Sequence, residues 1–356
     1  MHFIQDWPRP SKTTEIVIIG AGGIVKDSHL PAYRNGNYPV RGIWNRNPDR
    51  ARALGEDFEI GQVFDTLEQA TSYTDVIYDI ATSPQVHVDM LERLPDGVPV
   101  LIQKPMGLSL EVANAIRAVC ERKGLKAAVN FQLRFAPMML AIRNALEEGF
   151  FGQMIDIEVH LNLLTPWHLF PNLRNDPRIE IVAHSIHYID LIQSLVGVPQ
   201  ATFARGFRYP GGGLADTRTS AILNYGKDLR ATLSINHHHD FGRPQQASTI
   251  RFEGTEGAAV VKLGVLMDYP HGEPDELWIG RRGETLEQIP LGGHWFPDAF
   301  EHVMSNMQRF VNGEDDRLET SVASAWDTMA IVESCYASAA LPMEPVPQYQ
   351  PMGKSV

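Results

Sequence analysis

The feature that most constrains this chain is a short apolar run that ends in a cluster of glycines near the N-terminus. The run Glu15 to Ile19 leads directly into Gly20-Ala-Gly-Gly23, and a helix-compatible segment continues through Tyr33. An apolar run of this length is typical of a buried strand, and glycines permit turns that are too tight for other residues. The order therefore predicts a strand, a tight turn and a helix.

Strands and helices continue to alternate up to about residue 130. The predicted strands are Val40 to Trp44, Asp75 to Ala81, Val98 to Ile102 and Lys126 to Phe131. The predicted helices between them are Asp49 to Glu56, Pro84 to Leu94 and Ser109 to Lys123. Such alternation indicates a parallel sheet with right-handed crossovers, so we predict an α/β domain over residues 1–130.

The pattern changes after residue 130. Alternating runs of period two, separated by hairpin-length spacers, predict a largely antiparallel sheet in a second, α+β domain over residues 131–356. The predicted strands include Met154 to Asn162, Ala201 to Arg208, Thr219 to Tyr225 and Leu229 to Asn236. The predicted helices are Pro137 to Glu147, Val182 to Leu195, Asp298 to Val311 and Ser321 to Ala339.

The net charge bears on which partners the chain could bind, and the two cysteines bear on whether it forms disulfides. With 43 acidic against 31 basic residues the formal net charge is -12, which repels nucleic acid and anionic membranes. We see neither a signal-peptide core nor an uncharged apolar run approaching the roughly 20 residues of a spanning helix. Cys120 and Cys335 lie in predicted helices rather than in a disulfide framework. These features predict a soluble, cytoplasmic protein.

The glycine turn is a candidate site for the pyrophosphate of a dinucleotide. Glycines between a strand and a helix let backbone N–H groups approach phosphate, and Gly20 and Gly22 occupy that place. The third position of the G-x-G-x-x-G pattern is Val25, so the pattern is incomplete. A turn that only connects strand and helix is the alternative, but the surrounding alternation favours a dinucleotide site in a Rossmann domain.

The end of the second predicted strand bears on the choice between NAD and NADP. An acid usually stands there in NAD-binding sites and holds the ribose 2′-OH, but this chain has Asn45 followed by Arg46. Arg46 could accept a 2′-phosphate, which leans towards NADP. The alternative is a solvated arginine, with Asn45 bonding the 2′-OH of NAD.

Five segments in a fixed order carry a resemblance to a known family. The sequence resembles the glucose-fructose oxidoreductase, inositol dehydrogenase and MocA family of NAD(P)-dependent oxidoreductases. The resemblance implies a Rossmann domain, an open-faced sheet domain, an active site in the cleft between them, and homodimers or homotetramers that often pack through the sheet. The segments are Gly20-Ala-Gly-Gly-Ile24 with His29-Leu-Pro31, Ala81-Thr-Ser-Pro-Gln-Val-His87, Gln103-Lys-Pro105, Asn130-Phe-Gln-Leu-Arg-Phe-Ala-Pro137 and His184-Ser-Ile-His-Tyr-Ile-Asp190.

The resemblance implies two catalytic residues, Lys104 and His187. The family's Glu-Lys-Pro motif matches Gln103-Lys104-Pro105, and its lysine lies near the nicotinamide ribose and the substrate hydroxyl. A cation there stabilises a developing oxyanion, although a surface lysine at a strand end is the alternative. The family's helical histidine commonly acts as general base and matches His187, whose ordinary pKa near 6.5 suits proton removal around neutrality.

Both acids of the family pattern are missing from this chain. Gln103 replaces the glutamate, and Ala183 replaces an aspartate four residues before His187. His184 lies on the same helical face as His187, so it either binds substrate and shares its proton or fills a polar core position. Asp190 could orient the His187 ring, or it could be a domain-contact or solvated residue.

Further positions are assigned to cofactor and substrate. The cofactor contacts that we predict are Gly20, Gly22, Gly23, Ile24, Asn45, Arg46, Thr82, Ser83, Pro84, His87, Gln103 and Lys104. The predicted substrate contacts are Lys104, Gln132, Arg134, Trp167, His184 and His187. The alternative for Arg134 is an ion pair with an acid across the domain junction. Trp295 and Phe296 either face a sugar or anchor the last two helices.

The run His237-His-His239-Asp240 has the residue types of a metal site. Neighbouring residues of a strand point to opposite faces, so at most His237 and His239 could share an ion, and no other residue nearby has ligand spacing. We therefore expect no metal and assign the run to structure or subunit contact.

These observations predict reversible oxidation of a hydroxyl of a sugar or cyclitol. In this hypothesis His187 takes the hydroxyl proton, Lys104 stabilises the alkoxide, and hydride passes to the nicotinamide. Segments 293–300 and 328–333 resemble those of sugar-catabolic members of the family, near the D-apiose dehydrogenases. Two alternatives stay open: a non-catalytic NAD(P)-binding sensor, which the missing acids favour, and an oxidoreductase that recycles a tightly bound cofactor and acts on glycosides.

Overall fold

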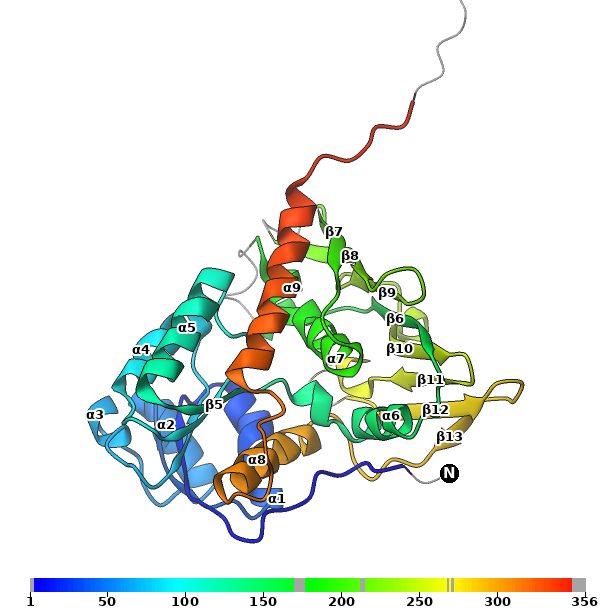
Figure 1. Cartoon of the computed structure of the whole chain (residues 1–356). Coiled ribbons are helices and arrows are strands. Elements are labelled where there is room, and N and C mark those ends of the chain that lie inside the picture. The colour runs from blue at the N-terminus through cyan, green and yellow to red at the C-terminus, as the bar shows by residue number, and fades with distance from the viewer. Residues whose placement is uncertain (1–2, 170–176, 212–214, 268, 270–271, 348–356) are drawn as a thin grey trace, which may run out of the picture.

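The computed structural model describes residues 3–169, 177–211, 215–267, 269 and 272–347, which form two sheets with helices packed around and between them (Figure 1). The first sheet has the order β2-β1-β3-β4-β5, and every neighbouring pair is parallel. Its strands are β1 (Ile16–Ile19), β2 (Val40–Trp44), β3 (Ile77–Ile80), β4 (Pro99–Ile102) and β5 (Lys126–Val129). The predicted parallel α/β sheet is confirmed.

Short helices connect these strands, and local sequence sets where they begin and end. The Ser109 side chain accepts a hydrogen bond from the Val112 N–H at the start of α5, and Gly124, with φ of 62°, ends it. The helices are α1 (Leu30–Asn35), α2 (Pro48–Asp57), α3 (Leu67–Ala70), α4 (His87–Arg93) and α5 (Leu110–Lys123). Before α1 lies a π-helical turn, η1 (Val25–His29).

The strand order places a crevice at the carboxyl ends of β1 and β3. The strands that follow β1 in sequence, β2 and β3, lie on opposite sides of it, and ligands bind at such switch points in open α/β sheets. Gly20 follows β1 with φ of 127°, and a Cβ atom there would lie 2.3 Å from the Ala81 carbonyl oxygen after β3. Only glycine fits this close approach, so Gly20 shapes the crevice.

The second sheet is large and mostly antiparallel. Its order is β13-β12-β11-β10-β6-β9-β8-β7, and only the β6–β9 pair is parallel. Its strands are β6 (Met154–Asn162), β7 (Ala201–Arg208), β8 (Asp216–Asn224), β9 (Arg230–Asn236), β10 (Ala247–Gly254), β11 (Gly257–Lys262), β12 (Glu276–Arg281) and β13 (Glu287–Ile289). The predicted α+β second part is confirmed.

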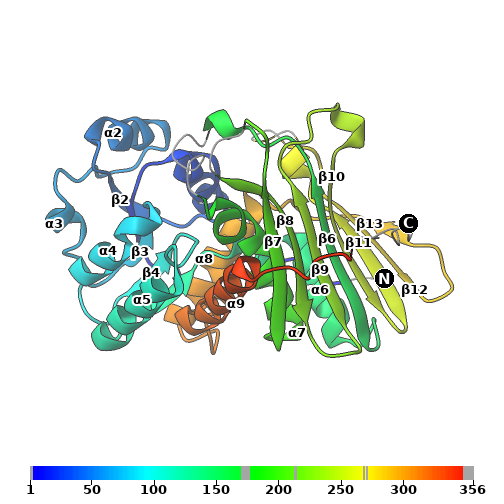
Figure 2. The same ribbon diagram turned by 90° about the horizontal axis from the view of Figure 1, so that it is seen from above.

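Helices cover one face of this sheet and fill the space beside the first sheet (Figure 2). The long C-terminal helix α9 packs against β7, α7 and α5, and α8 packs against α1 and β4, so both contact the first half of the chain. These helices are α6 (Pro137–Glu147), α7 (Ile186–Val196), α8 (Asp298–Val311) and α9 (Val322–Ala340). None of the helices in the described ranges is long and apolar enough to cross a membrane.

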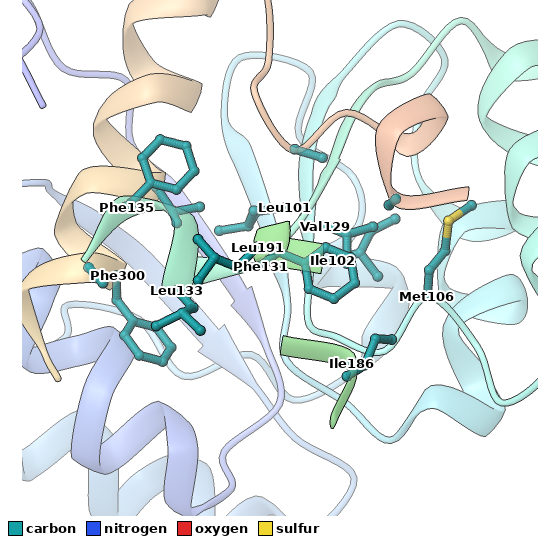
Figure 3. Close-up of a cluster of buried hydrophobic side chains, with 14 of the residues drawn as sticks. Leu101, Ile102, Met106, Val129, Phe131, Leu133, Phe135, Ile186, Leu191 and Phe300 are labelled. Atoms are coloured by element: carbon teal, nitrogen blue, oxygen red, sulfur yellow. The ribbon is translucent and has the colours of Figure 1, made fainter. Parts of the chain in front are cut away.

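An apolar cluster joins the two halves (Figure 3). Leu101, Ile102 and Val129 come from the first sheet, whereas Ile186 and Leu191 come from α7, and all five are buried. Phe131, Leu133 and Phe135 continue the cluster towards α8. Because close-packed side chains resist displacement, this cluster fixes the loop after β4 relative to the start of α7.

Candidate active site

A cavity of about 190 Å³ lies between the glycine turn, the loop after β4 and the second sheet. Ile24 and Lys104 line it from the first half of the chain, and the remaining lining comes from the second. The polar lining residues are Lys104, Gln132, Thr165, His184, His187, Tyr188, His237 and Tyr269. The structure therefore brings together Ile24, Lys104, Gln132, His184 and His187, which the sequence assigned to cofactor or substrate contacts.

Lys104 follows β4 and reaches across to the second half of the chain. Its Nζ donates a hydrogen bond of 2.9 Å to the carbonyl oxygen of Ala183, and its backbone N–H donates to Oε1 of Gln103 at 2.9 Å. The side chain is part-buried and faces the cavity, which excludes the alternative of an ordinary surface lysine. Burial lowers the pKa of Lys104 to about 8.

The two histidines are carried by a π-helical turn, η5 (Glu180–Ser185), and by the start of α7. His187 Nδ1 and His184 Nε2 are buried without a hydrogen-bond partner. Burial lowers the pKa of both rings well below the ordinary value, and the charge of Lys104 lowers both pKa values further. Both imidazoles are therefore neutral near pH 7, so each has a lone pair that can accept a proton.

Aromatic side chains surround these histidines. The ring of Trp295 lies 5.6 Å, centroid to centroid, from that of His187, in an edge-on arrangement. Trp167 is also edge-on to His184 at 5.6 Å, and it borders a neighbouring depression that shares Thr165 and Pro166 with the cavity. Trp295 and Phe296 line the cavity, which favours their assignment as walls of the site.

Arg134, predicted as a substrate contact, lies outside the cavity in this structure. Its guanidinium is buried in an ion pair with Asp190 at 2.5 Å and donates further to the carbonyl oxygen of Glu319 and to Ser324. It does not line the cavity. Asp190 in turn accepts from Arg134 and Thr328, so it does not orient His187. Asp190, which is 56 residues away in sequence, therefore holds the Arg134 guanidinium in an ion pair.

His87 also differs from its predicted role as a cofactor contact. Its ring is fully buried, and Nε2 lies 3.2 Å from the carbonyl oxygen of Thr82. Burial lowers the pKa of His87 to about 4. The buried ring therefore packs under the loop after β3 and contacts its backbone at Thr82. Ser83 and Pro84 of that loop remain accessible at the carboxyl end of the strand.

The glycine turn fits the phosphates of a dinucleotide. A Cβ atom at Gly22 would meet nothing within 4 Å, so the space above the turn is open, and the first N–H groups of a helix have no acceptors within it. Asn45 Oδ1 accepts from the Ala21 N–H at 3.2 Å, and its Nδ2 donates to the Asn47 carbonyl oxygen. Arg46 beside it is exposed.

Sequence reasoning missed three buried polar residues beside the histidines. Thr165 Oγ1 lies 2.7 Å from His237 Nδ1, and Glu180 lies on η5 with its carboxylate close to the His237 ring. The histidine run was noticed, but His237 comes after β9 and turns towards the cavity, which no strand alternation predicts. The only sequence feature that could have pointed to Glu180 is that it is an acid three residues before Ala183, the position of the missing family aspartate.

The other histidines of that run lie elsewhere. His238 stacks on Tyr209 with ring centroids 4.3 Å apart, and His239 Nδ1 contacts Asn162 Nδ2 at 3.0 Å. In the part of the chain that the structure describes, no three acidic, histidine or cysteine side chains converge as metal ligands.

Comparison with known families gives matches to both halves of the chain. Residues 14–131 match a family model described as an oxidoreductase family with an NAD-binding Rossmann fold. Residues 139–260 match the GFO/IDH/MocA C-terminal domain. The two matches together span most of the chain and agree with the resemblance that its motifs carry.

Individual relatives are distant but align over nearly the whole length. D-apiose dehydrogenase of Paraburkholderia graminis is 24% identical over 335 residues, which cover 90% of this chain and 86% of that protein. An Agrobacterium radiobacter oxidoreductase solved with NAD+, L-tartaric acid and magnesium has a TM-score of 0.75 at 20% identity, covering 92% and 97% of the two chains. Levoglucosan dehydrogenase, solved with NADH and levoglucosan, has a TM-score of 0.75 at 18% identity, covering 92% and 98%. At these identities, the structural likeness establishes the fold.

Proposed function

Because this chain belongs to the glucose-fructose oxidoreductase, inositol dehydrogenase and MocA family of oxidoreductases, we propose that it oxidises a hydroxyl of a sugar or cyclitol with NAD(P). One observation carries the proposal: Lys104 and His187 line the same cavity, together with Ile24 of the glycine turn. D-apiose dehydrogenase is among the similar proteins and supports a sugar-like substrate.

The residues of the cavity divide the chemistry between them. A bound nicotinamide supplies the hydride acceptor. Neutral His187 accepts the proton of the substrate hydroxyl, because its ring lines the cavity and its lowered pKa keeps it unprotonated. The ammonium of Lys104 then stabilises the alkoxide, and the apolar walls exclude water from the reacting carbon.

We propose that the backbone at Gly22, Gly23 and Ile24 holds the pyrophosphate and that Arg46 favours NADP over NAD. Both polar atoms of the Asn45 amide are engaged within the protein, which leaves the 2′ position of the ribose to the exposed Arg46. This supports the lean towards NADP that the sequence suggested.

The test is the appearance of reduced nicotinamide when the purified chain is offered NAD or NADP with pentoses, hexoses, cyclitols and glycosides. We expect absorbance to rise with at least one sugar, and His187→Gln to lower kcat by about 100-fold or more while cofactor affinity stays unchanged. Cofactor binding without turnover across the panel would instead indicate a sensor. Cofactor that copurifies with the chain would indicate internal recycling.

A further inference from the structure

Three polar side chains form a buried line beside the cavity: Thr165 and His237 border the cavity, and Glu180 does not. Thr165 Oγ1 lies 2.7 Å from His237 Nδ1, and His237 Nε2 lies 3.4 Å from Glu180 Oε1. All three are buried, with exposed fractions of 8%, 3% and 1%. The backbone fixes the first pair, because the Thr165 N–H donates to the His237 carbonyl oxygen at 3.1 Å.

The carboxylate sets the direction of hydrogen bonding along this line. Glu180 Oε1 accepts from Ser185 Oγ at 2.8 Å, whereas Glu180 Oε2 and His237 Nε2 are both buried without a hydrogen-bond partner. An ionised carboxylate only accepts, so the imidazole nitrogen that faces it must carry the hydrogen. A closure of a few tenths of an ångström brings Nε2 and Oε1 within ordinary hydrogen-bond distance. In the tautomer that carries its hydrogen on Nε2, Nδ1 is an acceptor, and the Thr165 hydroxyl donates to it.

This direction fixes what Thr165 offers to the cavity. The Thr165 hydroxyl donates its only hydrogen to His237, so its oxygen can only accept a hydrogen bond from a ligand. Within the proposed function, we propose that Thr165 accepts a hydrogen bond from a second hydroxyl of the sugar, and that His237 and Glu180 act as positioning residues for it.

The proposal defines a substrate class. The molecule must carry a hydroxyl beyond the one that is oxidised, and a carbonyl or an ether oxygen at that second place would be rejected, because neither can donate to Thr165. Discrimination of this kind is large when a buried polar group of the site would be left without its partner.

The first test needs no substrate. Histidine nitrogen-15 spectra of the whole ligand-free chain, with the His237 signals identified by their loss in His237→Gln, report which ring nitrogen carries hydrogen. We expect a neutral ring protonated on Nε2, and a smaller population of that form in Glu180→Gln. A ring protonated on Nδ1, or on both nitrogens, would overturn the proposal.

The second test uses the sugar on which the chain is active. Thr165→Val should raise KM about tenfold or more with kcat changed less than threefold, and Thr165→Ser should retain the native KM. Glu180→Gln should raise KM by a smaller factor. In the Thr165→Val background it should add nothing further, because the hydroxyl that His237 and Glu180 orient is gone.

The two kinds of failure can be distinguished. No turnover with any sugar contradicts the proposed function, whereas the nitrogen spectra still decide the direction of the Thr165–His237 hydrogen bond. Turnover with a KM that Thr165→Val leaves unchanged contradicts the second-hydroxyl contact alone. Additive effects of Thr165→Val and Glu180→Gln would show that Glu180 acts only on stability, which also contradicts the positioning role.

Discussion

The ammonium of Lys104 donates its hydrogen bond to the backbone carbonyl of Ala183, 2.9 Å away, at the position where the family pattern has an acid. The contact ties the loop after β4 to η5, but a carbonyl supplies a dipole where a carboxylate would supply a charge. Desolvation of the ammonium is therefore left uncompensated, and burial lowers the pKa of Lys104 to about 8.

This contact predicts the pH dependence of sugar oxidation. Lys104 stabilises the alkoxide only while it is protonated, so kcat/KM should fall as pH rises through about 8. The pKa of His187 is lowered well below its ordinary value, so the base stays active into mildly acidic solution. Ala183→Asp places a carboxylate beside Lys104, raises its pKa, and should move the alkaline limit upward by about one pH unit or more.

The measurement is a profile of kcat/KM from about pH 5 to about pH 10. Ala183→Asn is the matched control, because it adds a side chain of similar size without charge and should leave the alkaline limit where it is. An alkaline limit that stays in place in Ala183→Asp would show that another group sets it.

The sequence predicted those parts of the site that depend on local chain geometry or on short motifs. Gly20 was predictable because a strand-to-helix turn demands its backbone, and Lys104 and His187 because their motifs fix them at the ends of elements. Arg134 was not, since its burial against Asp190 depends on packing between distant segments. His237 was not either, because its direction after β9 is set by the backbone bonds to Thr165 and Thr217.

Arg46 should set cofactor preference. Its guanidinium is exposed beside Asn45 at the end of β2, where it could form an ion pair with the 2′-phosphate of NADP. We expect Arg46→Ala to lower kcat/KM for NADP about tenfold and to change the value for NAD less than twofold. Arg50→Ala, which removes another exposed arginine from α2, should change neither. Equal losses with both cofactors would contradict a role specific to the 2′-phosphate.

The buried Arg134–Asp190 pair should support folding rather than catalysis. Asp190→Asn leaves the guanidinium buried without its counter-charge, which typically costs about 3–5 kcal/mol of unfolding free energy. Chemical denaturation should show this loss, while KM for the sugar, measured where the variant is folded, stays near native. The control is Glu253→Gln in the exposed pair with Arg251, which should cost less than about 1 kcal/mol. A raised KM in folded Asp190→Asn would return Arg134 to the substrate site.

The uncovered face of the second sheet should hold copies of the chain together. Phe203 on β7 pairs in register with Ile222 on β8, and these apolar side chains are 51% and 47% exposed, while the helices lie on the other side of the sheet (Figure 2). Phe207, on the same face of β7, is 46% exposed. Exposed apolar side chains gathered on one face are typical of an interface, and a symmetric dimer uses the same patch twice.

Light scattering after size-exclusion chromatography should therefore give the mass of a dimer or tetramer for the native chain. Phe203→Lys combined with Ile222→Lys places like charges on both copies of the interface and should shift the mass towards that of a monomer. The control Asp49→Lys adds the same type of charge on exposed α2, far from this face in sequence and in fold, and should leave the assembly intact. A native chain that elutes as a monomer, or a double variant that assembles as the native chain does, would mean that the sheet face serves another purpose.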